Sequence, residues 1–257
     1  MRAFLLISFV TSVSSLFAQA TDSLAPKVYS WNTLEAVKED TRIRRQLLNG
    51  STTSLANFEV HASTLEPGKA PHPPHTHIDQ EELMIVKEGT VKITIAGKSK
   101  ILGPGSIAFA MAGDEHGIEN AGNTPATYYV LKYKGKKPDI ERGKQAGGSF
   151  IIDWNDPIAT NTGKGYRKAF FTRPTSQLVK FGMHTTALNK DSVSHAPHTH
   201  VDEEIILIIR GNVTMHIDGK LFPASPGDFV FLPSGIPHAL MNTGKEQTEY
   251  FAIQWRN

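Results

Sequence analysis

The sequence repeats itself once, at an almost constant spacing. The tripeptide SWN at 30–32 returns as DWN at 153–155, an offset of 123 residues. The same offset relates APHPPHTHIDQEE, which begins at Ala70, to VSHAPHTHVDEE, which begins at Val193. One residue is then lost, and the remainder aligns at an offset of 122. Such self-similarity indicates two copies of one structural unit. We place them roughly at 28–135 and 151–257, joined by a Gly/Lys-rich linker at 136–150.

The histidines follow the repeat. Of the 11 histidines, only His216 lacks a counterpart in the other copy. Scattered surface histidines have no reason to obey a repeat, so these positions are predicted to share a structural or chemical role. The paired positions are His61, His72, His75, His77 and His116 in the first copy, and His184, His195, His198, His200 and His238 in the second.

Composition excludes several chemistries. The absence of cysteine rules out disulfides, thiolate zinc sites, iron–sulfur clusters and a cysteine nucleophile. A transition metal would therefore have to bind His, Asp, Glu or water. The 27 basic residues nearly balance the 25 acidic ones and are scattered, so no basic patch indicates a nucleic-acid partner.

The first twenty residues have the pattern of a secretory signal peptide. A single positive charge at Arg2 precedes an apolar run, which ends in the small-residue motif Ala18-Gln19-Ala20. We expect residues 1–20 to be removed, leaving a periplasmic or extracellular protein with no membrane insertion after cleavage. The alternative is an uncleaved N-terminal anchor, although the run is short for a membrane span.

The rest of the chain is predicted to be all-β. Short β-rich runs such as LMIVKEGTVKITIAG and EIILIIRGNVTMHIDG are broken at close intervals by Gly, Pro and Asn, as in a barrel or jelly roll. The pairs EG, RG, AG and DG within these runs predict tight hairpin turns. A helical turn is expected only between Leu34 and Glu39.

Each copy carries a set of potential metal ligands. His75 and His77 are two residues apart in an extended segment, so both imidazoles should point to one face. Glu82 begins the next strand and His116 comes from a later hairpin. Three imidazoles and one carboxylate suit Mn, Fe, Co, Ni, Cu or Zn, with positions left open for water or substrate. The second copy repeats the set as His198, His200, Glu204 and His238.

These motifs resemble those of the cupin superfamily. In the first copy, His75-x-His77, four residues, Glu82, six residues and Gly89 form a pattern similar to the first cupin motif. Pro104-Gly105 followed by His116 is similar to the second motif, and both recur in the other copy. The resemblance covers almost the whole chain after residue 20. It implies a bicupin: two closely packed jelly-roll barrels, each with a three-His-one-Glu site for one divalent metal.

The resemblance leaves the reaction open. Similar ligands occur in oxalate decarboxylases, germin-type oxalate oxidases, quercetin dioxygenases and sugar isomerases. We expect a metal-dependent enzyme acting on a small oxygen-rich substrate, either an oxo-acid, a sugar or a phenolic. The alternative is a metal-dependent module that binds a carbohydrate or carboxylate without turnover.

Other paired residues have less certain roles. His72 and His195 lie three residues before the first ligand, where an imidazole could act as an acid or base or hold an anion; they could equally be loop histidines beside proline. The strand pair His61 and His184 could face either way. Two further pairs are open: Asn120 and Asn242 as substrate contacts or turn residues, and Arg44 and Arg167 as carboxylate-binding or surface residues.

The two copies are not identical around the acidic ligand. Four residues separate His77 from Glu82, whereas three separate His200 from Glu204. Glu81 and Glu203 are adjacent alternatives, but the distance to the following glycine favours Glu82 and Glu204. Because neighbouring strand residues alternate faces, the unused acid should point outward.

Overall fold

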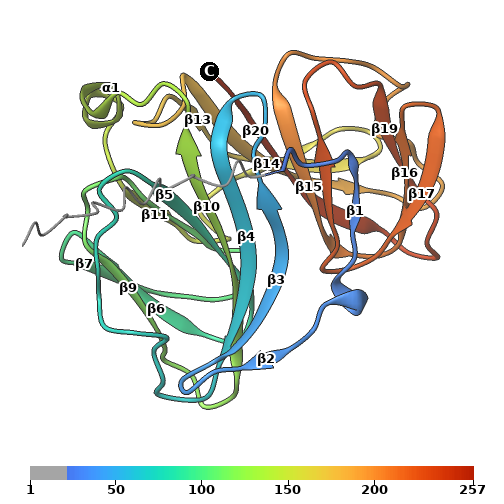
Figure 1. The fold of residues 1–257 in the computed structure, drawn as a ribbon. Coiled ribbons are helices and arrows are strands. Elements are labelled where there is room, and N and C mark those ends of the chain that lie inside the picture. Colours follow the sequence, from blue (N-terminus) through green and yellow to red (C-terminus); the bar gives the residue numbers. More distant parts are fainter. Residues whose placement is uncertain (1–21) are drawn as a thin grey trace, which may run out of the picture.

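The computed structural model describes residues 22–257 and is built almost entirely of strands (Figure 1). The fold predicted from the sequence, two tandem β-barrels of jelly-roll type, is confirmed. The predicted signal peptide at 1–20 lies outside the described residues. Within 22–257, no helix has the length and apolar character needed to cross a membrane.

The first half of the chain supplies all but one strand of the first barrel. Its elements are β1 Lys27–Tyr29, the 3₁₀ helix η1 Trp31–Thr33, β2 Val37–Lys38, β3 Ile43–Gly50, β4 Leu55–Leu65, β5 Glu81–Glu88, β6 Val91–Ile95, β7 Lys98–Leu102, β8 Ile107–Ala110, β9 His116–Asn120 and β10 Ala126–Gly135. A short helix, α1 Ile140–Gln145, follows within the predicted linker.

The second half repeats this order of strands. Its elements are β11 Phe150–Ile152, β12 Ala159–Asn161, β13 Gly165–Arg173, β14 Lys180–Leu188, β15 Glu203–Arg210, β16 Val213–Ile217, β17 Lys220–Ala224, β18 Phe229–Leu232, β19 His238–Asn242 and β20 Thr248–Arg256. In each barrel a seven-stranded sheet is combined with a three-stranded one.

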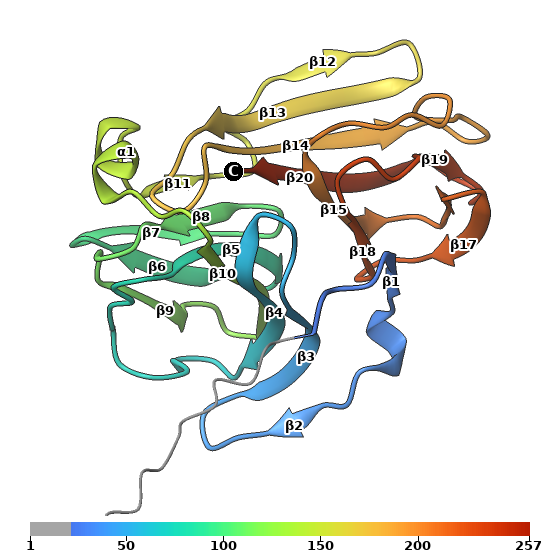
Figure 2. The same ribbon diagram turned by 45° about the horizontal axis from the view of Figure 1, so that its top comes forward.

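The two barrels exchange their first strands. The seven-stranded sheets have the orders β11-β8-β5-β10-β4-β3-β2 and β1-β18-β15-β20-β14-β13-β12. Strand β1, which precedes the first barrel in sequence, therefore pairs with β18 of the second, and β11 pairs with β8 of the first. Figure 2 shows β1 at the end of the second barrel and β11 beside β8. Each barrel is thus completed by a strand from the other half of the chain.

The largest hydrophobic core lies between the barrels. It combines residues from both halves, among them Phe58, Tyr129, Phe231 and Trp255. Two smaller cores fill the individual barrels. Each central strand serves two cores because successive side chains alternate faces. The two barrels consequently pack as one unit, and separating them would expose the largest buried apolar surface.

A tryptophan from each half packs against a glycine of the other barrel. A Cβ atom on Gly105 would lie 2.3 Å from Trp154, and one on Gly227 would lie 2.9 Å from Trp31. The Trp31 backbone N–H also donates to Asp228, at 2.8 Å. These contacts anchor η1 at Trp31–Thr33, so the helical turn expected between Leu34 and Glu39 is wrong. The contact that fixes this turn comes from the opposite barrel, beyond the reach of local sequence patterns.

The predicted hairpin turns are confirmed. Gly89 and Gly211 adopt positive φ angles of 78° and 77°, which glycine adopts without steric cost. The two-residue turns Ala96-Gly97 and Asp218-Gly219 have positive φ at both positions, as a type I′ hairpin requires.

Candidate metal centres

Strand alternation places the acidic ligand inside each barrel. In β5, Glu82 has the same parity as Met84 and Val86, which belong to the core of the first barrel. In β15, Glu204 likewise shares a face with Ile206 and with the core of the second barrel. Both carboxylates are therefore drawn inward by their apolar neighbours on the same face of the strand.

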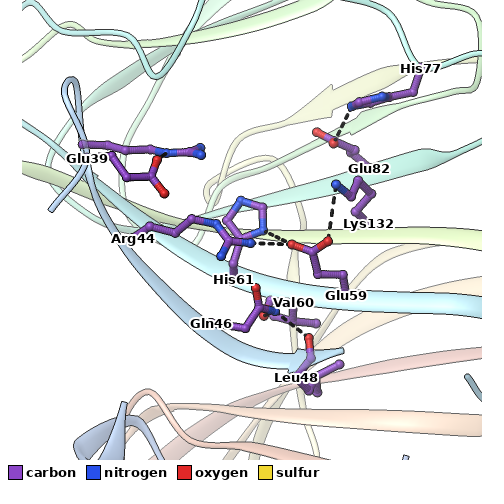
Figure 3. Close-up of polar contacts among 11 residues, drawn as sticks. Glu39, Arg44, Gln46, Leu48, Glu59, Val60, His61, His77, Glu82 and Lys132 are labelled. Atoms are coloured by element: carbon purple, nitrogen blue, oxygen red, sulfur yellow. Dashed lines mark hydrogen bonds and ion pairs between the residues drawn. The ribbon is translucent and has the colours of Figure 1, made fainter. Parts of the chain in front are cut away.

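The first barrel brings its four predicted ligands together. Donor atoms of His75, His77, Glu82 and His116 all lie within 4.8 Å of one another. The Glu82 carboxylate lies 3.0 Å from His77 Nε2 and 3.2 Å from His116 Nε2 (Figure 3 shows the His77 contact). Backbone hydrogen bonds between His75 and His116, of 3.0 and 2.9 Å, join the loop to β9 and hold these two ligands side by side.

The second barrel has the same arrangement with a displaced carboxylate. Donor nitrogens of His198, His200 and His238 lie within 4.8 Å of one another. Glu204 contacts two of them, with Oε2 at 3.4 Å from His200 Nε2 and 3.2 Å from His238 Nε2. Gln254 Nε2 donates to the other carboxylate oxygen at 3.0 Å. The carboxylate of this site is thus held by a neighbouring amide as well as by the imidazoles.

Backbone carbonyls fix the tautomer of three of the imidazoles. Because a carbonyl only accepts, each Nδ1 must donate to it, which leaves Nε2 with a lone pair for a metal. The contacts are His116 Nδ1 to Asp114 O at 3.1 Å, His200 Nδ1 to Asp202 O at 2.8 Å, and His238 Nδ1 to Ile236 O at 2.9 Å. The Nε2 atom of His200 is buried and has no hydrogen-bond partner among residues 22–257, an arrangement that a bound cation would satisfy.

The charges of these groups also suit a cation. Burial opposes ionisation of Glu204, but the neighbouring imidazoles of His200 and His238 outweigh it and lower its pKa to about 2. Burial and neighbouring histidines lower the pKa of His75 to about 4. An anionic carboxylate and a neutral imidazole are the forms that bind metals. The residues present therefore fit a divalent metal in each barrel.

The adjacent acids point out of the cavities and into the interface. Glu203 is 1% exposed and accepts hydrogen bonds from the hydroxyl of Thr52, the backbone N–H groups of Thr53 and Ser54, and Trp255 Nε1, at 2.9–3.1 Å. Glu81 of the first barrel makes the reciprocal contact with the second half of the chain, because the Ser176 N–H and hydroxyl donate to it at 2.9 and 2.7 Å. The outward direction expected for these acids thus leads to the other barrel rather than to solvent.

Each metal centre opens into a cavity. The first is about 200 Å³ and the second about 450 Å³. His72 and His195 line these cavities, with their rings 4.2 Å from that of His75 and 3.9 Å from that of His198, respectively. Both are exposed loop residues whose Nδ1 contacts the next backbone carbonyl. The structure therefore places them beside the predicted ligands, at the solvent side.

Comparison with known proteins identifies the family. The cupin domain family matches residues 62–132 and 185–254, which together make up more than half of the chain. The chain belongs to the cupin family. Because the family matches twice, the chain is a bicupin, as its motifs predict.

Individual relatives are more distant. The oxalate-binding protein of Thermotoga maritima is 39% identical over 57 residues, which are 22% of this chain and 47% of that protein. The match therefore spans about half of that relative. Among solved structures, a putative glyoxylate-induced protein from Pseudomonas aeruginosa is similar, with a TM-score of 0.71 and 18% identity over 95% of this chain and 93% of that one. An oxalate decarboxylase from Lactobacillus farciminis has a TM-score of 0.70 and 12% identity, covering 91% and 87%. At these identities the two structures show the shared fold.

The remaining repeated residues of the bicupin divide into two groups. His61 and His184 face the cavities and line them. Asn120 and Asn242 instead stabilise turns through their side chains. The Asn120 side-chain amide donates to the Leu65 and Thr124 carbonyls, and the Asn242 amide makes the equivalent pair of hydrogen bonds. Of the two interpretations left open for these asparagines, turn chemistry is the one that the structure supports.

The sequence analysis missed a charged network in the first cavity. The Glu59 carboxylate lies 2.5 Å from Arg44 Nη2, 3.1 Å from His61 Nδ1 and 3.4 Å from Lys132 Nζ (Figure 3). All four side chains line the cavity. The hydrogen bond from His61, together with Lys132 and Arg44, lowers the pKa of Glu59 to about 2. Burial lowers the pKa of His61, so its neutral imidazole donates to a carboxylate. Aligning the copies position by position would have revealed Glu59, which has no acidic counterpart.

This network predicts acid-sensitive stability. Glu59 has a lowered pKa in the folded chain and an ordinary value of 4.5 otherwise, so its stabilising effect is complete above pH 4.5 and is lost as the pH falls toward 2. Relative to wild type, E59Q should lower the free energy of unfolding by about 1–2 kcal/mol at pH 6, after allowance for solvent screening, and by much less at pH 3. Urea unfolding of both proteins at the two pH values measures this. An equal difference at both would contradict it.

Proposed function

We propose that this bicupin is a metal-dependent enzyme that acts on a small, oxygen-rich acid. The observation that carries the proposal is the convergence of three imidazoles and a carboxylate in the lining of an open cavity, repeated in both barrels. A metal held by His75, His77, Glu82 and His116, or by the second set, would act as a Lewis acid and orient oxygen ligands.

Backbone carbonyls, two loop histidines and apolar side chains around the metal centres would support this chemistry. The backbone carbonyls that bind Nδ1 keep the ligand imidazoles in one orientation. His72 and His195 donate through Nδ1 to a carbonyl, which leaves Nε2 as an acceptor beside the first ligand. In that position each imidazole is suited to receive or deliver a proton as substrate enters. The second cavity adds Leu188, Ile206 and Leu240, whose apolar surfaces limit water around a bound substrate.

The second candidate function is metal-dependent binding without turnover. Its support is the local similarity to a protein named for binding oxalate, 39% identical over 57 residues. Both candidates share the ligand class, a small molecule rich in oxygen, and differ only in whether it is transformed.

We also propose export. The support is the pattern of residues 1–20, with one basic residue, an apolar run and a small-residue end. Fractionation of cells that express the full chain, followed by N-terminal sequencing, tests this. Recovery of an exported protein that begins near Thr21 is the expected result, whereas an intact N-terminus in the membrane fraction would favour an anchor.

Metal removal tests the enzyme proposal. We expect protein purified without added metal or chelator to contain up to two metal equivalents, measured by mass spectrometry. Turnover of an oxo-acid or a uronic acid should stop on chelation and return when metal is restored. Tight binding of such a compound without turnover, under every metal added back, would favour the binding module instead.

A further inference from the structure

The two cavities differ at one acidic position. Glu59 in β4 corresponds to Gly182 in β14, and this equivalence is structural as well as sequential. In the first barrel Glu59 is paired with Lys132 of β10, and in the second Gly182 is paired with Gln254 of β20. Arg44 and Arg167 also occupy equivalent registers, opposite Ser63 and Thr186. Both barrels therefore keep the arginine, but only the first has the carboxylate.

In the first barrel, the carboxylate occupies the arginine. Glu59 Oε1 lies 2.5 Å from Arg44 Nη2 and 3.1 Å from His61 Nδ1, while Oε2 lies 3.4 Å from Lys132 Nζ. Figure 3 shows these three side chains converging on Glu59. Because Glu59 occupies the Arg44 guanidinium from within, an external anion would have to displace it, and the remaining cavity is about 200 Å³.

In the second barrel, the equivalent arginine has no such partner. Among residues 22–257, no hydrogen bond or ion pair engages Arg167, which is solvent-exposed and lines the cavity together with Lys164 and His184. The Lys164 ammonium donates a hydrogen bond to the Val193 carbonyl, at 3.0 Å. The cavity is larger, about 450 Å³, and contains the metal-ligand histidines of that barrel. An arginine fork beside an open cavity matches the geometry of a carboxylate.

We propose that the second barrel binds a small organic anion whose carboxylate pairs with Arg167, and that Glu59 closes the first barrel to such anions. The internal carboxylate of the first barrel marks the place that the ligand carboxylate takes in the second. This assignment deepens the proposed function, because it places the acidic substrate in one of the two barrels and names the residue that selects its charge.

Calorimetric titration of the metal-loaded chain with malonate tests the assignment, with uncharged malonamide as the control ligand. We expect one malonate per chain and no comparable binding of malonamide. R167Q should weaken malonate binding roughly tenfold or more, because a charge-assisted pair is lost. R44Q is the matched control and should leave the affinity unchanged. Since Arg167 is exposed, its replacement should not affect folding.

Opening the first barrel provides a second, independent test. E59G copies the residue that the second barrel carries and should raise the stoichiometry from one malonate to two. Adding R44Q to E59G should return it to one. Two equal sites in the wild type, wild-type affinity in R167Q, or no malonate binding at all would each overturn the assignment.

These outcomes are separate from the fate of the proposed function. Binding that depends on Arg167 but is never followed by turnover of any anion would leave the assignment intact and contradict the enzyme proposal. Metal-dependent turnover with an affinity that is indifferent to Arg167 would do the reverse.

Discussion

Replacing Glu204 by alanine should abolish turnover, whereas the same change at Glu82 should leave most of it. Each variant loses a carboxylate that contacts two ligand imidazoles, so each should lose about one metal equivalent. Groups that only hold metal ligands in place commonly change metal affinity or activity 10–100-fold. Loss of the ligand itself in the active second barrel, by E204A, should therefore lower kcat/KM by more than about 100-fold. The difference between the variants arises because only the second cavity offers an unoccupied arginine for an acidic substrate.

Metal content and kcat/KM, measured on the same preparations, distinguish the possible outcomes. E246A is a suitable control, because Glu246 is exposed and lines neither cavity. Equal losses of kcat/KM in E82A and E204A would mean that both barrels are active. Full activity in the double variant E82A/E204A would remove the basis for metal-dependent catalysis.

The repeat and its histidines were sufficient to predict the architecture and the arrangement of the ligands. The distance to the following glycine favours Glu82 and Glu204 over their neighbours, and the period-two alternation of strands then predicts that the unused acid lies on the opposite face. Glu82 and Glu204 both lie inside their barrels beside the predicted histidines. Geometry that follows from short-range periodicity is accessible from sequence.

Contacts between the two halves were not accessible in the same way. The exchange of β1 and β11 depends on three-residue strands whose partners lie in the opposite barrel. Nothing in a three-residue pattern specifies which distant edge it completes. Likewise, strand alternation predicts that Glu203 points away from the cavity. It does not predict that Thr52, Thr53 and Ser54 of the first barrel donate hydrogen bonds to Glu203 on that side.

The repeat also concealed the functional asymmetry. Searching for positions shared by the two copies emphasises what duplication preserved, such as the five histidine pairs. Glu59 against Gly182 and Lys132 against Gln254 are differences, and their meaning depends on which side chains face the same cavity. Strand register supplies this information, because it pairs Glu59 with Lys132 and Gly182 with Gln254.

The second prediction with a large expected effect concerns the acid at the interface. E203A should lower the free energy of unfolding by about 3–5 kcal/mol, because four donors from both barrels, three of them buried, lose their acceptor. For a chain of this size, that corresponds to a fall in Tm of about 6–20 °C. Burial raises the pKa of Glu81, which opposes its ionisation, so E81A should have a smaller effect.

Because Glu203 adjoins a metal ligand, the comparison requires metal-free protein, so that loss of bound metal does not contribute to the measured stability. Urea unfolding of wild type, E203A, E81A and the exposed-site control E246A provides the free energies. A single cooperative transition that moves to lower urea in E203A would show that the hydrogen bonds across the interface stabilise both barrels together. If E203A unfolded like E246A, the interface would be stabilised by its shared apolar core alone. The hydrogen bonds to the buried carboxylate would then be no more favourable than those that the same donors make with water in the unfolded chain.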